Sequence, residues 1–407
     1  MECGLLGRKL AHSYSPQIHR YLGNYPYTLH ELEENQVGAF LQNSHFTGLN
    51  VTIPYKKTVI PYCAELTDCA KKVGAVNTIV RKNDGSLIGH NTDYFGFYSM
   101  VSKSGLNVAG KKVLVLGSGG AAVTVIAVLI ELKANVVVIS RTGENNYTNL
   151  HLHADAAVIV NTTPVGMYPN VGASPVDLAL FPKLEGVLDL IYNPARTKLL
   201  LDAESKGIVT LNGLWMLVAQ AKESAEWFTG SRIPDSIIQD IYNKLSHQMQ
   251  NIILIGMPGS GKSAVGHMLA ERLGRKFVDA DAEIESRTRM TIPEIFAKGG
   301  ETQFREVETQ ILADICKESA LVIATGGGCV TQECNYPHLH QNSLIIWLQR
   351  EIEKLPTNGR PLSQSTALKD MYALRKPLYS HWSDVAIDNN GAPGGSVDAI
   401  LQFIEKG

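Results

Sequence analysis

A strand-like run that leads into a glycine-rich loop and then a helical pattern constrains this chain most strongly. Residues 252–255 are all apolar, residues 256–263 read Gly-Met-Pro-Gly-Ser-Gly-Lys-Ser, and an apolar helical face extends from Val265 to Leu273. The full eight-residue pattern between a strand and a helix is typical of a P-loop. The backbone N–H groups of such a loop turn inward around phosphate oxygens, so the sequence predicts a nucleoside triphosphate site here.

The residues of this loop have separate expected tasks. Lys262 supplies a positive charge to the outer phosphates, and the hydroxyl of Ser263 suits Mg²⁺. The alternative is a glycine-rich turn without a ligand, but the flanking strand and helix favour the P-loop. The residues predicted to hold ATP are Gly259, Ser260, Gly261, Lys262, Ser263 and Ala264.

The P-loop begins far into the chain, so the preceding residues must form something else. A length of 407 residues predicts two or three domains. A net charge of −2 gives no basic surplus for binding nucleic acid or a membrane surface. The six cysteines include no C-x-x-C pair, and we find neither a signal peptide nor an apolar run long enough to span a membrane. We therefore expect a soluble cytoplasmic protein, monomeric or homodimeric, whose partners are small molecules.

Four polar clusters occupy the first 93 residues, at the ends of alternating strand-like and helix-like stretches. This alternation is typical of an α/β fold. Their amides and hydroxyls suit a neutral polyol that is bound by hydrogen bonds. Taken alone, Ser13 and Ser15 would more often be capping or turn residues, and Lys56 a solvated lysine. The clusters are HSYSP (12–16), NVTIPYK (50–56), GAVNT (74–78) and GHNTD (89–93).

In this order the four clusters resemble the N-terminal half of shikimate dehydrogenase. The resemblance implies that Lys56 and Asp93 form the catalytic pair. Reduction of a ketone by hydride needs a proton donor at the developing alkoxide, and an ammonium beside a carboxylate can both donate and stabilise that charge. A plain salt bridge is the alternative. The residues implied to bind the substrate carboxylate or ring hydroxyls are Ser13, Ser15, Thr52, Asn77 and Asp93.

A second glycine-rich turn, at residues 117–122, joins a buried strand to an apolar helix over 123–132. It reads Gly-Ser-Gly-Gly-Ala-Ala and matches the dinucleotide-binding fingerprint, with Ala122 in place of the third glycine. Arg141 follows the next strand, where an NAD-specific fold would usually show an acid, and an arginine suits a 2′-phosphate. We therefore expect NADP(H). The residues predicted to hold it are Gly117, Ser118, Gly119, Gly120, Ala121, Arg141 and Thr142.

Two features depart from the pattern of shikimate dehydrogenases. Ser140 stands where that family generally carries Asn, and residues 143–149 offer no further basic side chain. The stretch from Arg141 to Asn161 is also short for a helix and a strand, so we expect a trimmed outer part of the cofactor domain. The later motifs match the family. The residues implied to reach substrate or nicotinamide are Tyr192, Gln220, Gly213 and Met216.

Residues 250–407 resemble shikimate kinase through six motifs in order. These are GMPGSGKS (256–263), FVDAD (277–281), FREVE (304–308), TGGG (325–328), GRPL (359–362) and RKPLY (375–379). The spacing of Asp279 and Asp281 predicts both on one side of a strand end, and the resemblance implies that Asp279 supports Mg²⁺, that Asp281 serves substrate binding and catalysis, and that Arg360 belongs to a lid over ATP. The residues implied to hold shikimate are Asp281, Arg305, Gly327, Gly328 and Arg375.

These patterns predict an α/β protein with three parts. We expect a substrate domain over 1–92, with helices over 214–247 packed back on it, then a Rossmann-like NADP domain over 93–213. A three-layer P-loop kinase domain, similar to nucleoside monophosphate kinases, follows over 250–407 without a flexible linker.

The expected function is bifunctional: NADPH-dependent reduction of 3-dehydroshikimate to shikimate, followed by phosphorylation of shikimate by ATP and Mg²⁺. Two alternatives stay open. The first half could be a regulatory or shikimate-binding module on an active kinase, or it could oxidise quinate as well as shikimate.

Overall fold

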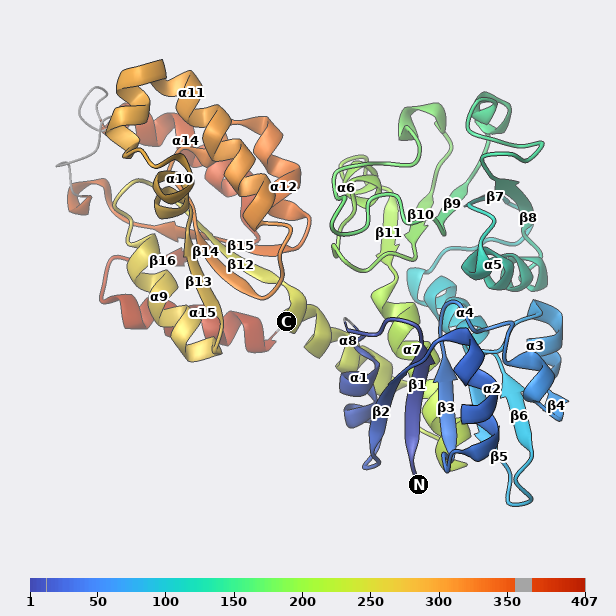
Figure 1. Cartoon of the computed structure of the whole chain (residues 1–407). Helices are drawn as coiled ribbons and strands as arrows, with labels where there is room; N and C mark the ends of the chain where they lie inside the picture. Colours follow the sequence, from blue (N-terminus) through green and yellow to red (C-terminus); the bar gives the residue numbers. More distant parts are fainter. Residues whose placement is uncertain (12, 356–367, 407) are drawn as a thin grey trace. The chain divides into compact units, whose positions relative to one another are not determined.

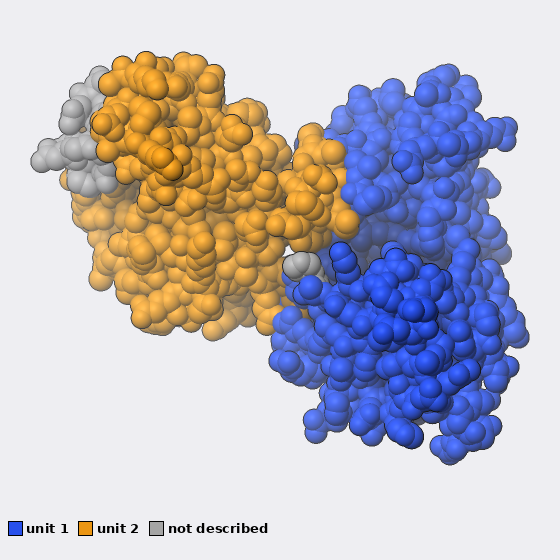
Figure 2. Space-filling model, viewed as in Figure 1, with its two compact units in different colours: residues 1–165, 174–192, 202–244 blue, residues 166–173, 193–201, 245–407 orange. Residues whose placement is uncertain are grey.

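The computed structural model describes residues 1–11, 13–355 and 368–406. Figure 2 colours the two compact units into which the chain divides. Unit 1 comprises residues 1–165, 174–192 and 202–244, and unit 2 comprises residues 166–173, 193–201 and 245–407. Both units are built from sheets and helices, so the predicted α/β class is confirmed. Among the described residues, no helix combines the length and the apolar character that crossing a bilayer requires.

Unit 1 starts with a six-stranded sheet in the order β2-β1-β3-β5-β6-β4 (Figure 1). The sheet is mixed, since β1 runs parallel to β2 and β3 whereas β5 is antiparallel to β3 and β6. Helix α7, from the far end of the unit's sequence, packs on α1 and α4. The elements are β1 (Cys3–Gly7), α1 (Ser15–Leu22), β2 (Tyr27–Glu31), α2 (Glu34–Asn43), β3 (Gly48–Val51), η1 (Ile60–Tyr62), β4 (Glu65–Leu66), α3 (Asp68–Val73), β5 (Thr78–Arg81), β6 (Leu87–His90), α4 (Asp93–Ser104) and α7 (Leu214–Thr229).

The second sheet of unit 1 is parallel, in the order β11-β10-β9-β7-β8. Residues 113–116 of β7 are fully buried, as expected for a central strand of a parallel sheet. Between β8 and β9 lies only the one-turn helix η2, so the predicted shortening is present and β8 remains at the edge of the sheet. The elements are β7 (Lys112–Leu116), α5 (Gly120–Glu131), β8 (Asn135–Ile139), η2 (Leu150–His153), β9 (Val158–Asn161), η3 (Leu178–Leu180), β10 (Gly186–Asp189) and β11 (Val209–Asn212). Helix α6 (Lys198–Glu204), between β10 and β11, begins in unit 2 and ends in unit 1.

Unit 2 contains a parallel sheet in the order β13-β14-β12-β15-β16. Alternate residues of its central strand serve opposite cores: Ile252 and Leu254 belong to the core that includes α9 and α15, whereas Ile253 and Ile255 belong to the core that includes α11 and α14. Helix α8 (Ser236–Met249) begins in unit 1 and ends in unit 2. The elements that follow it are β12 (Asn251–Ile255), α9 (Lys262–Leu273), β13 (Lys276–Asp279), α10 (Ala280–Thr288), α11 (Ile292–Ile315), β14 (Leu321–Ala324), η4 (Cys329–Thr331), η5 (Glu333–Asn335), α12 (Tyr336–His340), β15 (Ser343–Gln349), η6 (Ile352–Lys354), α14 (Leu368–Trp382), β16 (Val385–Asp388) and α15 (Pro393–Lys406).

Candidate active sites

A cavity of about 610 Å³ in unit 1 gathers polar residues that are far apart in the sequence. They come from the start of α1, the turn after β3, the start of α4, the loop after β10 and the first turns of α7. The predicted residues that line it are Ser13, Ser15, Thr52, Lys56, Asn77, Asp93, Ala121, Tyr192, Gly213, Met216 and Gln220. The structure therefore brings the predicted substrate and nicotinamide residues together in one place.

Lys56 and Asp93 form an ion pair inside this cavity. The Nζ atom of Lys56 lies 2.5 Å from Oδ2 of Asp93, and their side chains are 29 % and 17 % exposed. Asp93 is the first residue of α4, where the helix N-terminus stabilises a carboxylate. The ammonium is thus held by a fixed carboxylate and still reaches the cavity, which is the arrangement that proton donation to a bound substrate requires.

A buried network of amides and hydroxyls supports the floor of the cavity. Oδ1 of Asn77 accepts a hydrogen bond from the backbone N–H of Thr92 at 2.7 Å, and Nδ2 of Asn50 donates to Oγ of Ser224 at 2.8 Å. Ser224 also lies 3.0 Å from the Thr92 hydroxyl. Sequence reasoning missed Ser224, because a serine within a long helix carries no local signal that it will meet a strand residue in the core.

Ser13 and Ser15 both line the cavity at the start of α1. Tyr14 is the N-cap residue of α1, and its side chain makes no capping hydrogen bond. Ser15 is 9 % exposed, and its backbone N–H donates to Oγ of Ser13 at 3.2 Å. The structure thus places both serines at the cavity, and their role as ligands of a substrate carboxylate stays a prediction.

The glycine-rich turn after β7 leaves open space above the start of α5. A side chain on Gly117, at φ +106°, would place Cβ 2.8 Å from Oγ1 of Thr162, so the turn requires glycine there. No atom lies within 4 Å of the Cβ positions of Gly119 and Gly120. These residues, with Ser118 and Ala121, are exposed at a helix N-terminus, which fits a pyrophosphate.

Arg141 and Thr142 lie directly after β8, the neighbour of β7 in the sheet, and both are exposed. The carboxyl ends of parallel strands lie on the same edge of the sheet, so Arg141 lies on the same edge as the glycine-rich turn. The residues present therefore fit a dinucleotide with a phosphate on its adenosine ribose.

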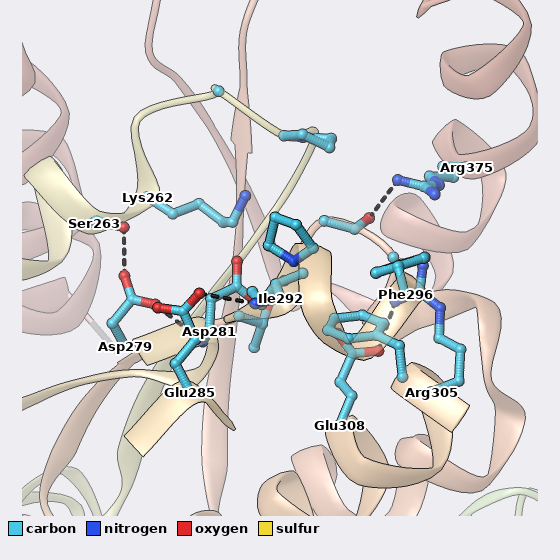
Figure 3. A pocket seen from close by; sticks show the side chains of 18 of the residues that line it. Lys262, Ser263, Asp279, Asp281, Glu285, Ile292, Phe296, Arg305, Glu308 and Arg375 are labelled. Atoms are coloured by element: carbon cyan, nitrogen blue, oxygen red, sulfur yellow. Dashed lines mark hydrogen bonds and ion pairs between the residues drawn. The ribbon is translucent and has the colours of Figure 1, made fainter. Parts of the chain in front are cut away.

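A second cavity, of about 500 Å³, lies in unit 2 (Figure 3). The P-loop and the two aspartates lie at one end of it, and Arg305 and Arg375 lie at the other. Predicted residues lining the cavity are Gly259, Gly261, Lys262, Ser263, Ala264, Asp279, Asp281, Arg305, Gly327, Gly328 and Arg375. One end therefore suits phosphates and a cation, and the other suits an anionic group.

Lys262 lies folded against the backbone of its own loop. Its Nζ atom donates to the carbonyl oxygens of Gly256 and Met257, at 2.9 and 3.0 Å, and the residue is only 8 % exposed. The loop itself requires glycines, because Gly259 and Gly261 have φ values of +83° and +93°. This geometry positions a cation and inward-facing amides for phosphate oxygens.

Asp279 connects the P-loop helix to α10. Its Oδ2 accepts a hydrogen bond from the Ser263 hydroxyl at 2.6 Å, and its Oδ1 caps α10 by accepting from the backbone N–H of Asp281 at 3.0 Å. The sequence predicts both aspartates on one side of a strand end; Asp279 is the last residue of β13, and the cap places Asp281 in the first turn of α10. The oxygens of Ser263 and Asp279 are hard ligands and fit Mg²⁺.

The two arginines at the far end are each held by hydrogen bonds to the protein. Nη1 of Arg305 donates to Oε2 of Glu308 at 2.7 Å, and Nη1 of Arg375 donates to the carbonyl oxygen of Gly327 at 3.1 Å. Burial raises the pKa of Glu308, which is fully buried and whose Oε1 accepts no hydrogen bond from the described residues. Sequence reasoning did not assign Glu308, although its position three residues after Arg305 in a helix was a usable signal.

We expect the substitution Asp281→Asn to raise the unfolding temperature of unit 2 at pH 7 by about 2–4 °C, since removing one buried charge is worth on the order of 1 kcal/mol. Burial raises the pKa of Asp281 above its unfolded value and outweighs the opposing effect of Lys262. The carboxyl group of Asp281 therefore binds its proton more tightly in the folded chain than in the unfolded chain. The free energy of unfolding falls as the pH rises from the unfolded pKa to the folded pKa, and at higher pH the ionised carboxylate costs stability.

Differential scanning calorimetry checks this expectation. Asp314→Asn is the matched control, because the hydrogen bond from Lys317 lowers the pKa of Asp314 and its ionised form favours the folded state. A lower unfolding temperature for Asp281→Asn than for the unsubstituted chain would contradict the expectation that the buried, ionised carboxylate of Asp281 destabilises the folded state.

Comparisons with known proteins identify the families to which the two parts of the chain, each with its own cavity, are similar. Residues 5–79 match the family model described as the shikimate dehydrogenase substrate binding domain. The NADP(+)-dependent shikimate dehydrogenase of Clostridium perfringens is 36 % identical over 264 residues, which cover 60 % of this chain and 97 % of that protein. The chain belongs to the shikimate dehydrogenase family. Its residues 258–405 match the shikimate kinase family model, so one polypeptide combines a shikimate dehydrogenase with a shikimate kinase.

Solved structures of shikimate dehydrogenases also resemble the dehydrogenase part. That of Peptoclostridium difficile is 38 % identical, covers 60 % of this chain and 97 % of its own, and gives a TM-score of 0.54. That of Thermus thermophilus, in complex with NADP(H) and shikimate, is 29 % identical, covers 60 % and 99 %, and gives a TM-score of 0.55. The predicted family, fold class and bifunctional character of the chain are therefore confirmed. Arg360, the predicted lid residue of the kinase, lies outside the described residues.

Proposed function

We propose that the cavity of unit 1 reduces 3-dehydroshikimate to shikimate with NADPH and that the cavity of unit 2 phosphorylates shikimate at its 3-hydroxyl with ATP and Mg²⁺. The domain boundaries that go with this proposal are 1–92 with 214–247, 93–213, and 250–407. The observation that carries it is the Lys56–Asp93 pair, 2.5 Å apart, in a cavity lined by hydroxyls and amides.

In the dehydrogenase, NADPH supplies the hydride when bound. Lys56 donates a proton to the carbonyl oxygen of the substrate as it becomes a hydroxyl, and Asp93 holds the ammonium in place. Ser13 and Ser15 bind the carboxylate of the substrate, while Thr52, Asn77, Tyr192 and Gln220 bind or border its ring. Gly213 lets the start of α7 pack closely against the loop after β10, because a Cβ there would lie 2.0 Å from the carbonyl oxygen of Leu190.

In the kinase, Arg305 and Arg375 clamp the carboxylate of shikimate at the end of the cavity away from the P-loop (Figure 3). This directs the ring hydroxyls toward Asp281. Burial raises the pKa of Asp281, which improves its match to a base that accepts a hydroxyl proton. Lys262 stabilises the charge that develops on the transferred phosphoryl group, and Ser263 with Asp279 would hold Mg²⁺.

Steady-state assays of the purified chain test this function. We expect NADPH consumption on addition of 3-dehydroshikimate, with slower turnover of NADH, and formation of shikimate 3-phosphate from shikimate and ATP. A chain that phosphorylates shikimate but never turns over NADPH would support the alternative of a binding module. Oxidation of quinate at a rate comparable to that of shikimate would broaden the substrate class of unit 1.

A further inference from the structure

Arg350 stands beside the P-loop without an assigned role. It follows directly after β15, the neighbour of β12 in the parallel sheet, and the P-loop follows β12. Both segments therefore lie at the same edge of the sheet, beyond the carboxyl ends of their strands. The Nη1 atom of Arg350 lies 3.7 Å from the position that a Cβ on Gly261 would take, so the guanidinium borders the phosphate-binding backbone.

No partner of the Arg350 guanidinium is found in the part of the chain that the structure describes. Over the residues that the structure describes, the guanidinium forms no ion pair, and its Nε atom is buried from solvent without a hydrogen-bond partner. Other arginines of unit 2 are paired: Arg272 with Asp398 and Arg287 with Glu283 and Asp314. The buried, unpaired Nε costs stability, whereas the Nη atoms are not among the buried unpartnered atoms and are the donors that a ligand can reach; of these, Nη1 borders Gly261.

Neighbouring loops fix the place of Arg350. Nδ2 of Asn389, just after β16, donates to the carbonyl oxygen of Ser260 in the P-loop at 2.5 Å. The backbone N–H of Glu351, the next residue after Arg350, donates to Oδ1 of Asn390 at 2.9 Å. The P-loop, the segment after β15 and the loop after β16 are thus joined by direct hydrogen bonds, and Arg350 lies where they meet.

We propose that Arg350 is a nucleotide-binding residue of the kinase, whose guanidinium hydrogen-bonds a phosphate oxygen of the adenine nucleotide beside Gly261. The proposal depends on the ATP-dependent function proposed above. The Nζ of Lys262 donates to the carbonyl oxygens of Gly256 and Met257 and supplies one compact positive charge. A guanidinium beside Gly261 adds a second charge whose several N–H groups can donate to phosphate oxygens. The ligand class is a nucleoside di- or triphosphate, and the contact does not involve the base.

Binding of ADP and adenosine to three variants tests this role. Arg350→Gln is expected to weaken the binding of ADP, measured by calorimetry, roughly 10- to 100-fold, the loss typical of a charge-assisted hydrogen bond. Inhibition of the kinase by adenosine should not change, and Arg350→Lys should recover part of the affinity. Arg272→Gln, which breaks an exposed ion pair on α9, is the matched control and should bind ADP like the unsubstituted chain.

Thermal unfolding separates a ligand contact from a structural role. The nucleotide-free Arg350→Gln chain should unfold at the same temperature as the unsubstituted chain or higher, because an unpaired buried donor is removed, while the stabilisation by ADP should shrink. Unchanged ADP affinity would overturn the proposal, as would a lower unfolding temperature combined with equal losses of ADP and adenosine binding. An unsubstituted chain that binds no ADP would instead refute the ATP-dependent function itself.

Discussion

Replacement of Lys262 by Met is expected to slow the turnover of shikimate to its phosphate by roughly 10³-fold, while NADPH-dependent reduction continues at its original rate. Lys262 is a fixed cation at the carbonyl oxygens of Gly256 and Met257, and its loss removes charge stabilisation that is needed only in the transition state of phosphoryl transfer. Met fills a similar volume, so the packing of this residue, which is only 8 % exposed, should be kept.

A one-pot reaction makes the outcome visible. Given 3-dehydroshikimate, NADPH and ATP, the Lys262→Met chain should accumulate shikimate and form almost no shikimate 3-phosphate. Lys276→Met is the matched control, because Lys276 is exposed and begins β13, at the end of the parallel sheet away from the P-loop. A collapse of NADPH consumption in a Lys262→Met chain that is still folded by circular dichroism would show that the two sites are not independent.

The P-loop could be predicted residue by residue because its chemistry resides in one short segment. The positive φ values of Gly259 and Gly261 are local consequences of the motif, and so is the place of Lys262 at the start of α9. The neighbouring acid pair was harder to predict. The spacing of Asp279 and Asp281 fits either a strand or a helix start, and the capping hydrogen bond from the backbone N–H of Asp281 decides for the helix.

The dehydrogenase cavity could be predicted only through the family resemblance. Its residues extend from Ser13 to Gln220, and they meet because α7 returns from the far end of unit 1 to pack on α1 and α4. Periodicity and composition contain no information on such a return. The same limit explains why Ser224 was missed, since it is an ordinary helical residue until tertiary packing places it under the site. Glu308 differs, because its spacing from Arg305 within one helix was a local signal.

The shortened stretch between β8 and β9 shows where length alone was informative. The stretch from Arg141 to Asn161 is short for a full helix and a strand, and the structure contains there only the one-turn helix η2 ahead of β9. By contrast, the proposed role of Arg350 depends on its distance to Gly261 and on the absence of an acceptor for its buried Nε among the described residues. The sequence shows only that an arginine follows a strand, and neither of these two observations can be inferred from that.

Substitution of Lys56 by Ala is expected to slow the catalytic turnover of the dehydrogenase by roughly 10²-fold or more, with kinase activity unchanged. Lys56 is the cation that contacts Asp93 in the cavity of unit 1, and removal of a positioned proton donor raises the barrier of the chemical step. The KM for the ketone substrate should change far less than kcat, because hydroxyls and amides elsewhere in the cavity supply most of the binding.

Lys57→Ala is the control for this experiment, since Lys57 has the same charge one position later and is exposed. It should leave both activities intact, whereas Lys56→Ala should impair only reduction. Steady-state kinetics with NADPH in excess separates the two possible roles of Lys56. A rise in KM at constant kcat would make Lys56 a substrate-binding residue, and the proton that completes the hydroxyl of shikimate would then have to come from another group that lines the cavity.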